Sequence, residues 1–287
     1  MIMNIENLIK QIVLKFNVST QEAWWIIETL TQKNQAQLIS EQNITLTDSQ
    51  QKQLDQWEHE YTILHKPIQY ILGKVNFCGL EIFVEPPVLI PRNETEYWCD
   101  WLTKQLSTLS NKKLNILDMC SGSGCIGLTL AKNFPDSTIW AVDISNKAIE
   151  LIKKNSKYND IKNLIVLHSD LFNNITNVMF DLIVSNPPYI DQIFYKNLDR
   201  SVKDWEDIGA LMAQDSGLEI IKKIITQSPK FLKINKEFRK KQIPQFVMEF
   251  DITQGKIVEN LLKDANFVNI KIHKDLTYRD RFISAGI

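Results

Sequence analysis

Four consecutive residues, Asn186-Pro187-Pro188-Tyr189, follow an apolar run that predicts a buried strand over Phe180–Ser185. Each proline lacks a backbone N–H, so the strand must stop here and leave carbonyl oxygens outside the sheet ladder. The Asn186 side chain adds a second acceptor, and Tyr189 adds a flat aromatic face. Two acceptors beside a flat face suit a planar NH2 group, such as that of a glutamine side chain, an adenine or a cytosine.

A glycine-rich turn, Cys120-Ser121-Gly122-Ser123-Gly124-Cys125-Ile126-Gly127, lies between a predicted strand and a predicted helix. Its pattern Gly-x-Gly-x-x-Gly matches the dinucleotide fingerprint, and Asp143 follows at roughly the expected 20 residues. The glycines let the backbone approach a ligand closely, and a carboxylate after the second strand can accept both ribose hydroxyls. The pattern therefore predicts a nucleoside-type cofactor, but it does not distinguish nicotinamide dinucleotide from S-adenosylmethionine.

Three further observations favour S-adenosylmethionine. Asp118 lies in the approach to the loop, where a carboxylate is favourable near a cationic sulfonium and unfavourable near a pyrophosphate. Asp170 and Leu171, after the third predicted strand, offer an acceptor and an apolar wall for an adenine. The acceptor turn at Asn186 suits a methyl donor, whereas a hydride-transfer site would usually need a general acid.

The elements that position these residues alternate between strand and helix from Lys113 onward, which indicates an α/β fold with a mostly parallel sheet. The predicted strands are Leu114–Met119, Thr138–Val142, Leu164–His168, Phe180–Ser185 and Gln245–Phe250, with Phe267–Ile272 and Arg281–Ala285 as a terminal antiparallel pair. We therefore expect seven strands.

The N-terminal segment predicts a small helical bundle. Apolar residues recur at helical spacing over Ile5–Phe16, and Ser19–Glu22 and Thr47–Gln50 fit capping boxes for two more helices. Acidic residues outnumber lysines here, which argues against a nucleic-acid clamp. Adjacent Trp24 and Trp25 cannot both face the core of one helix, so one of them is available to a partner or to the neighbouring domain.

Between the bundle and the sheet, the sequence predicts a short helix ended by Gly73 and a hairpin that turns near Gly79. Prolines keep the next stretch extended, and Asn93-Glu94-Thr95-Glu96 predicts a capped start for a helix reaching about Leu106. The predicted domains are therefore a helical domain over 1–72, a hairpin linker over 73–92 and a catalytic domain over 93–287.

Composition sets outer limits on function. The chain has 287 residues, 44% hydrophobic and 23% charged, with a formal net charge of −1, so no global field attracts nucleic acid or membrane. Its four cysteines lack metal-ligand spacing and suggest free thiols in a reducing cytosol, and no metal is expected. No apolar stretch reaches the ~18 residues that a membrane span needs. The basic cluster between Lys230 and Lys241 is more typical of a solvated face than of a polyanion contact.

The motifs resemble those of class I amino-methyltransferases. The quoted segments are Asp118–Gly124, Asp143, Ser169-Asp170-Leu171 and Asn186-Pro187-Pro188-Tyr189-Ile190. Gln69–Gly73, Leu89–Glu96, Asp204-Trp205-Glu206, Ala210-Leu211 and the closing Asp275-Leu276 and Arg279-Asp280-Arg281 narrow the similarity to the HemK/PrmC family of peptide-chain-release-factor glutamine N5-methyltransferases. Two departures are Cys120, where the family usually has glycine, and Asn93, where it usually has proline. Cysteine is small, so cofactor binding should survive, and Asn93 should cap the helix.

The resemblance implies a class I S-adenosylmethionine-dependent methyltransferase that modifies the glutamine of a Gly-Gly-Gln loop in class 1 release factors. The implied cofactor-binding residues are Asp118, Cys120, Ser121, Gly122, Ser123, Gly124, Asp143, Asp170, Leu171 and Asn186. The implied catalytic residues are Asn186, Pro187 and Tyr189, and Pro188 joins them in substrate binding. The Asn186 oxygen and the Pro187 carbonyl would accept the two amide hydrogens, Tyr189 would pack on the amide plane, and the helical domain would hold the protein substrate. A cytoplasmic monomer that does not bind nucleic acid is expected.

Other functions remain open from the sequence. A ribosomal-protein glutamine methyltransferase shares the same chemistry. An adenine-N6 or cytosine-N4 nucleic-acid methyltransferase uses the same turn for exocyclic amines, but it should carry a basic recognition domain. A non-catalytic nucleoside-binding protein would have no need for the acceptor turn.

Overall fold

The computed structural model describes residues 2–110 and 113–287, and its contacts divide the chain into two units. The first unit is the chain up to Lys74 together with Asp199–Trp205, and the second is Val75–Leu198 with Glu206–Ile287. Contacts thus group the hairpin with the second unit. The division into 1–72, 73–92 and 93–287 remains a prediction about domain function.

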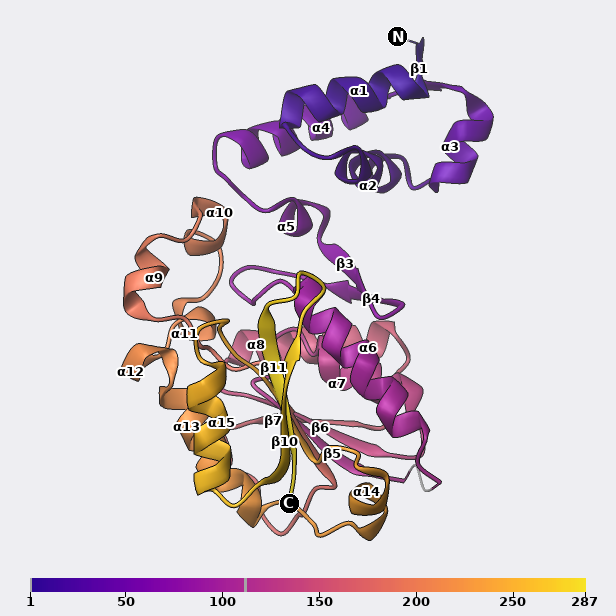
Figure 1. The fold of residues 1–287 in the computed structure, drawn as a ribbon. Coiled ribbons are helices and arrows are strands. Elements are labelled where there is room, and N and C mark those ends of the chain that lie inside the picture. The colour runs from indigo at the N-terminus through magenta and orange to yellow at the C-terminus, as the bar shows by residue number, and fades with distance from the viewer. Residues whose placement is uncertain (1, 111–112) are drawn as a thin grey trace. The chain divides into compact units, whose positions relative to one another are not determined.

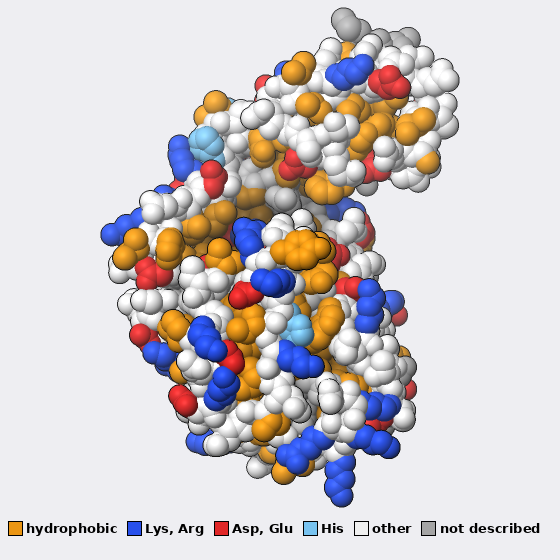
Figure 2. All heavy atoms as spheres, in the orientation of Figure 1, with side chains coloured by type: hydrophobic (Ala, Val, Ile, Leu, Met, Phe, Trp, Pro, Cys, Tyr) orange, Lys and Arg blue, Asp and Glu red, His pale blue; other side chains and the backbone are white. Residues whose placement is uncertain are grey.

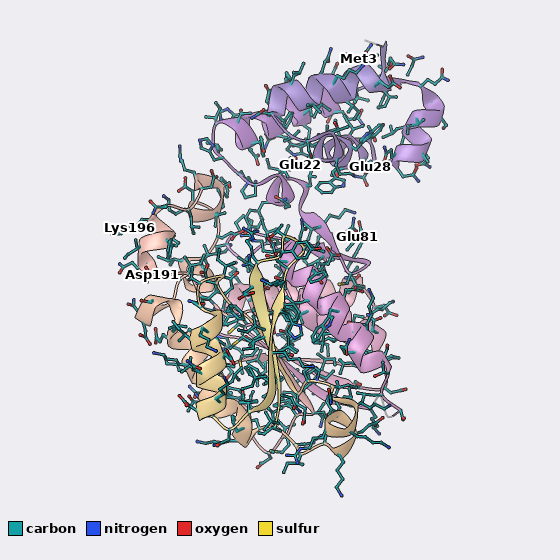
Figure 3. The ribbon with its side chains drawn as sticks, viewed as in Figure 1. Met3, Glu22, Glu28, Glu81, Asp191 and Lys196 are labelled. Atoms are coloured by element: carbon teal, nitrogen blue, oxygen red, sulfur yellow. The ribbon has the colours of Figure 1, made fainter. Side chains whose placement is uncertain are left out.

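The first unit is a bundle of α1 (Ile5–Phe16), α2 (Thr20–Thr31), α3 (Gln35–Glu41), α4 (Asp48–Thr62) and α5 (Ile68–Leu72) (Figure 1). Both predicted capping boxes are present, Ser19 with Glu22 (labelled in Figure 3) and Thr47 with Gln50. The chain leaves α5 at Gly73, whose φ of 78° lies in the left-handed region that glycine adopts at low cost. Trp24 is buried and Trp25 is 39% exposed, as the prediction for this pair required.

The first unit also contains features that the sequence did not reveal. Strand β1 (Ile2–Asn4) pairs antiparallel with β2 (Asn43–Thr45). Helix α10 (Arg200–Lys203) comes from a distant part of the chain, and beside it Trp205 Nε1 donates to the Leu64 carbonyl at 3.0 Å. Three-residue strands are too short to show the alternation of apolar and polar residues by which a strand is predicted.

The second unit is built on a seven-stranded sheet. Its strands are β5 (Asn115–Met119), β6 (Thr138–Asp143), β7 (Leu164–His168), β8 (Leu182–Ser185), β9 (Phe246–Glu249), β10 (Val268–Lys274) and β11 (Asp280–Gly286). The spatial order is β10-β11-β9-β8-β5-β6-β7. Strands β5 to β9 run parallel, and β11 is antiparallel to both β9 and β10. The predicted α/β class, the seven strands and the antiparallel pair are confirmed.

Helices cover both faces of this sheet (Figure 1). On one face lie α6 (Asn93–Ser107), α7 (Cys125–Asn133) and α8 (Asn146–Tyr158), and on the other α13 (Glu219–Gln227) and α15 (Gly255–Asp264). Neighbouring strand residues point to opposite faces: Ile116 packs with the α6 and α7 side, and Leu117 with the α13 and α15 side. Both faces are therefore apolar, as a covered parallel sheet requires.

Short elements complete the second unit. They are the helices α9 (Gln192–Lys196), α11 (Ile208–Leu211), α12 (Gln214–Gly217) and α14 (Lys236–Lys241), the 3-10 turn Ser228–Lys230, and the hairpin of β3 (Lys74–Phe77) and β4 (Leu80–Phe83). Asp191, which caps α9, and Lys196, its last residue, are labelled in Figure 3. Among the described residues, no helix combines the length and apolarity needed to cross a membrane.

The start of α6 differs from the prediction. Asn93 is the first helical residue, the cap position belongs to Arg92, and no side chain caps the helix. Glu96, expected to reach back to the cap, instead accepts a hydrogen bond from the Cys78 N–H of the hairpin at 2.7 Å. Thr95 points into the protein and donates to Glu249 at 2.7 Å. The prediction that Asn93 caps the helix is wrong. The polar side chains of Thr95 and Glu96 in this turn form hydrogen bonds with residues outside the helix instead.

Candidate active site

A cavity of about 430 Å³ lies at the carboxyl edge of the parallel strands. It opens where the strand order reverses, since the chain runs from β5 outward through β6 and β7 and then crosses to β8 on the other side. Such a reversal leaves a crevice between the loops that leave the two central strands, and ligands of α/β proteins bind there. Its volume is typical of a small-molecule site.

The cavity brings together residues from four predicted loops. Those that line it are Cys120 and Gly122 after β5, Asp143 at the end of β6, Asp170 and Leu171 after β7, and Asn186 and Pro188 after β8. The remaining predicted residues (Asp118, Ser121, Ser123, Gly124, Pro187 and Tyr189) lie outside the lining. The strand ends thus converge on one site.

The glycine-rich loop is held in left-handed backbone conformations. Cys120, Gly122 and Gly124 have φ values of 61°, 55° and 83°. A residue with a Cβ pays roughly 1–2 kcal/mol in this region, which gives a physical reason for glycine at the position that Cys120 occupies. Burial, together with the nearby Asp143 and Asp118, raises the pKa of the Cys120 thiol, so the side chain is a small neutral group in the wall of the cavity.

Asp118 lies beneath the loop, contrary to the expectation that it faces the ligand. Its Oδ2 accepts a hydrogen bond from the Gly127 N–H at 2.9 Å, and its Oδ1 has no partner among the described residues. Burial raises the pKa of this carboxyl to about 7. Side chains alternate along β5, so Met119 lines the cavity while Asp118 points to the α7 side. A direct contact of Asp118 with the ligand is therefore not supported.

The serines and Gly124 of the loop also act on its shape. The Ser121 hydroxyl donates to the Asp118 carbonyl at 2.8 Å, and the Ser123 carbonyl accepts from Asn155 Nδ2 at 3.0 Å. Gly124 is the residue before α7, and a Cβ placed there would lie 3.1 Å from Ile152. These contacts fix the path of the backbone around the cavity.

Asp143 terminates β6 and connects two loops. Its Oδ2 accepts from the Gly122 N–H at 2.8 Å, and its Oδ1 accepts from the Ser145 N–H at 2.9 Å. Burial raises the pKa of this carboxyl, and the backbone donors oppose that shift. Each oxygen has a lone pair left, so the carboxylate can still accept from two hydroxyl groups of a ligand.

Segments without predicted site residues also line the cavity, among them Pro87–Leu89, a stretch that includes Asp207, Gly209 and Ala210, and Glu219 at the start of α13. The Asp207 N–H donates to the Pro87 carbonyl at 2.8 Å. Next to them, Arg92 Nη2 lies 2.5 Å from a buried oxygen of Glu206. The first two segments overlap stretches that resemble the family, Leu89–Glu96 and Ala210-Leu211. No chemical role was expected for these stretches, so the sequence did not predict that they line the cavity.

The turn after β8 presents its acceptors to the cavity through Asn186. The Asn186 amide Nδ2 donates to Thr95 Oγ1 at 3.1 Å, and within the described residues no group donates to its Oδ1. Pro187 is buried, and Pro188 lines the cavity. Tyr189 does not line the cavity, and its hydroxyl donates to Glu249 Oε1 at 3.0 Å. Its predicted place against a substrate amide is not supported, because the ring packs in the core below the turn.

Family models match two parts of the chain. The PrmC N-terminal domain matches residues 15–73, and the methyltransferase small domain matches residues 99–202. The catalytic domain of hMettl16, solved with an RNA hairpin, resembles the structure with a TM-score of 0.54 at 16% identity, over 84% of this chain and 82% of that one. At this identity the likeness concerns the fold, which is that of class I S-adenosylmethionine-dependent methyltransferases.

Curated relatives match nearly the whole chain. A release factor glutamine methyltransferase of Flavobacterium psychrophilum is 36% identical, over 91% of this chain and 89% of its own length. One of Thermodesulfovibrio yellowstonii is 34% identical, over 95% of this chain and 94% of its own. Matches of this extent include both structural units and the cavity between the strand ends. The chain belongs to the family of release factor glutamine methyltransferases.

Proposed function

We propose that this protein transfers a methyl group from S-adenosylmethionine to the side-chain amide nitrogen of the glutamine in the Gly-Gly-Gln motif of class 1 release factors. The observation that carries the proposal is that Asn186 belongs to two features at once. It lines a cavity of nucleoside-cofactor type and also opens the acceptor turn. A planar NH2 group held by this turn would lie beside whatever occupies the cavity.

The charge of the cavity suits S-adenosylmethionine. Among the described residues the lining includes four acids, Asp143, Asp170, Asp207 and Glu219, and no lysine or arginine. A pyrophosphate would be repelled here, whereas a cationic sulfonium and an α-amino group would be attracted. Asp143 would accept hydrogen bonds from the ribose hydroxyls, and Asp170 with Leu171 would hold the adenine. When bound, S-adenosylmethionine supplies an electrophilic methyl group on a positively charged sulfur.

The acceptor turn compensates for a weak nucleophile. An amide nitrogen reacts poorly because its lone pair is delocalised into the carbonyl group. Asn186 Oδ1 and the Pro187 carbonyl accept hydrogen bonds from the two N–H groups of the substrate amide and hold its nitrogen towards the cavity. Catalysis therefore rests mainly on positioning. The same oxygens stabilise positive charge that develops on the nitrogen. The proton that the nitrogen finally loses passes to water.

The helical first unit and the mixed surface charge suit a protein substrate. The first unit supplies a helical surface with more acidic than basic residues, and it holds the release factor away from the reacting atoms. Figure 2 shows Lys and Arg interspersed with Asp and Glu over much of the visible face, without the continuous basic surface typical of nucleic-acid enzymes. The proposal includes a cytoplasmic, monomeric enzyme that does not bind nucleic acid directly.

The test is mass spectrometry of a purified class 1 release factor incubated with the full-length protein and isotopically labelled S-adenosylmethionine. We expect one labelled methyl group on the glutamine of the Gly-Gly-Gln motif, and none when that glutamine is replaced by alanine. Ribosomal proteins and DNA serve as competing substrates in parallel reactions. Preferential labelling of either of them would overturn the proposed substrate.

A further inference from the structure

A buried carboxylate lies behind the acceptor turn. Glu249, at the end of β9, is 1% exposed and does not line the cavity. Its Oε2 accepts from Thr95 Oγ1 at 2.7 Å and from Trp98 Nε1 at 2.8 Å, and its Oε1 accepts from the Tyr189 hydroxyl at 3.0 Å. Three donors from helix α6 and from the turn after β8 therefore meet on one side chain.

The direction of these hydrogen bonds follows from the chemistry of the groups. Burial raises the pKa of the Glu249 carboxyl, and the three donors that face its oxygens oppose that rise. Because these donors occupy it as an acceptor, the single hydroxyl hydrogen of Thr95 is committed to Glu249. Towards Asn186, 3.1 Å away, Thr95 can then offer only its oxygen lone pair. Asn186 must present its NH2 group to Thr95, which leaves Oδ1 as the atom available at the cavity. The carboxylate thus determines which end of the Asn186 amide is the acceptor.

The orientation matters because the two ends of an amide have nearly the same shape and opposite polarity. If the amide of Asn186 turned over, its NH2 group would face the NH2 group of the substrate, and two donors would meet. Thr95 without its link to Glu249 permits that arrangement, because a free hydroxyl can donate to Oδ1 as readily as it accepts from Nδ2. When Glu249 fixes the direction of the Thr95 hydroxyl, only one orientation of the Asn186 amide forms the hydrogen bond to Thr95.

We propose that Glu249, acting through Thr95, is a positioning residue that holds the Asn186 amide with its oxygen towards the substrate nitrogen. The inference rests on the proposed function, since it assigns a cause to the acceptor role of Asn186. Tyr189 belongs to the same arrangement, because its bond to Glu249 Oε1 ties the far end of the turn to the same carboxylate. The residue types of the turn alone would not determine which end of the Asn186 amide faces the substrate.

The test compares three substitutions on α6 in the full-length protein, by single-turnover methylation of intact release factor. Thr95→Val keeps the shape of the side chain and removes the hydroxyl, and we expect the rate to fall on the order of 10-fold to 100-fold. Thr95→Ser keeps a hydroxyl and should recover most of that loss. Thr103→Val is the matched control, because its hydroxyl donates to the Cys99 carbonyl and lies outside the cavity.

A double substitution separates positioning from general packing. If Thr95 acts through Asn186, Thr95→Val should cause almost no further loss in an Asn186→Ala background. The affinity for S-adenosylmethionine should change by the same amount in Thr95→Val as in Thr103→Val. The free energy of unfolding should fall further in Thr95→Val, because the buried Glu249 carboxylate loses one of its donors. A Thr95→Val protein with the parent rate, or an equal loss in both backgrounds, overturns the inference. Failure of the parent protein to methylate any release factor would instead overturn the proposed function.

Discussion

At the scale of single residues, Asn186 carries the largest expected effect on turnover. Asn186→Ala keeps the proline-bounded backbone and removes the acceptor that holds one amide hydrogen, so the substrate amide can rotate away from the cavity. Loss of one preorganised partner of this kind typically costs ~10²–10³ in rate. The measurement is single-turnover methylation of a release factor, with calorimetric titration of S-adenosylmethionine alongside. An alanine variant that reacts at the parent rate would contradict the role of the turn.

Asp143 should control cofactor affinity. Asp143→Asn keeps one oxygen acceptor and replaces the other with a donor, so at least one charge-assisted hydrogen bond to the ligand is lost, worth roughly 1.5–3 kcal/mol. We expect the dissociation constant for S-adenosylmethionine to rise about tenfold or more by calorimetry. Asp136→Asn, an exposed carboxyl near the opposite end of the same strand, should leave it unchanged. Equal affinities of the two variants would remove Asp143 from the site.

Asp118 should make stability depend on pH. Its pKa is raised from 3.8 to about 7 by burial, so the folded protein retains a proton that the unfolded chain releases. The contribution of Asp118 to the free energy of unfolding therefore falls as the pH rises from about 4 to about 7 and levels off above that range. Urea titrations at pH 5 and pH 7.5 should show a smaller decrease in Asp118→Asn than in the parent. Identical decreases would show that Asp118 ionises normally in the folded state.

The sequence predicted the residues at strand ends better than their roles. Cys120, Gly122, Asp143 and Asn186 line one cavity because parallel strands bring their carboxyl ends to a single edge. The expectation for Asp118 was wrong because side chains alternate along β5, so Asp118 and Met119 point to opposite faces and only Met119 lines the cavity. Glu249 was not predicted, since a lone carboxylate at the end of a buried strand gives no sign of its partners 60 to 154 residues away.

At the scale of elements, the core strands were predictable and the polar ends of helices were not. Apolar runs with β-branched residues predicted the strands of the sheet to within a few residues, and the inner strands β5, β8 and β9 are buried on both faces. The start of α6 was misread since Glu96 serves the Cys78 N–H rather than its own helix. Local cap patterns predict a helix start reliably only where no tertiary contact competes for the same side chains.

The entry to α7 should tolerate little change. Gly124→Ala places a Cβ at φ 83° and 3.1 Å from Ile152, so both strain and crowding oppose the substitution. We expect a loss of about 1–2 kcal/mol in the free energy of unfolding and weaker S-adenosylmethionine binding. Gly286→Ala is the matched control, because its Cβ would meet only ordinary contacts at 3.7 Å or more. Chemical denaturation of both variants decides the point, and equal losses would contradict the conformational argument.

At the scale of the whole protein, the predicted domains were continuous stretches of sequence, and the structure departs from this at one segment. The segment Asp199–Trp205 groups with the N-terminal helices, although it lies between two parts of the second unit in the sequence. Trp205 donates to the Leu64 carbonyl, and Lys66 Nζ lies 5.5 Å from the centre of the Trp205 ring. Composition and periodicity describe neighbours along the chain, so they do not show that Asp199–Trp205 groups with helices far away in the sequence.

The division of labour between the two units gives the last prediction. Every residue that lines the cavity belongs to the second unit, so a chain that begins at Gly73 should bind S-adenosylmethionine with the parent affinity. It should also methylate a short Gly-Gly-Gln peptide about as fast as the full chain, because such a peptide engages only the acceptor turn. On intact release factor, loss of the second attachment point should lower kcat/KM on the order of 10²-fold.

Measuring both substrates with both proteins separates recognition from folding. A shortened chain that fails on the peptide as well as on the protein has lost its active site, which calorimetry with S-adenosylmethionine would show independently. A shortened chain that keeps the peptide rate and loses the protein rate places recognition in the helices. Equal rates on intact release factor for the two chains would contradict this assignment. The buried apolar stripe of α1 and α2 would then stabilise the fold without contributing to the choice of substrate.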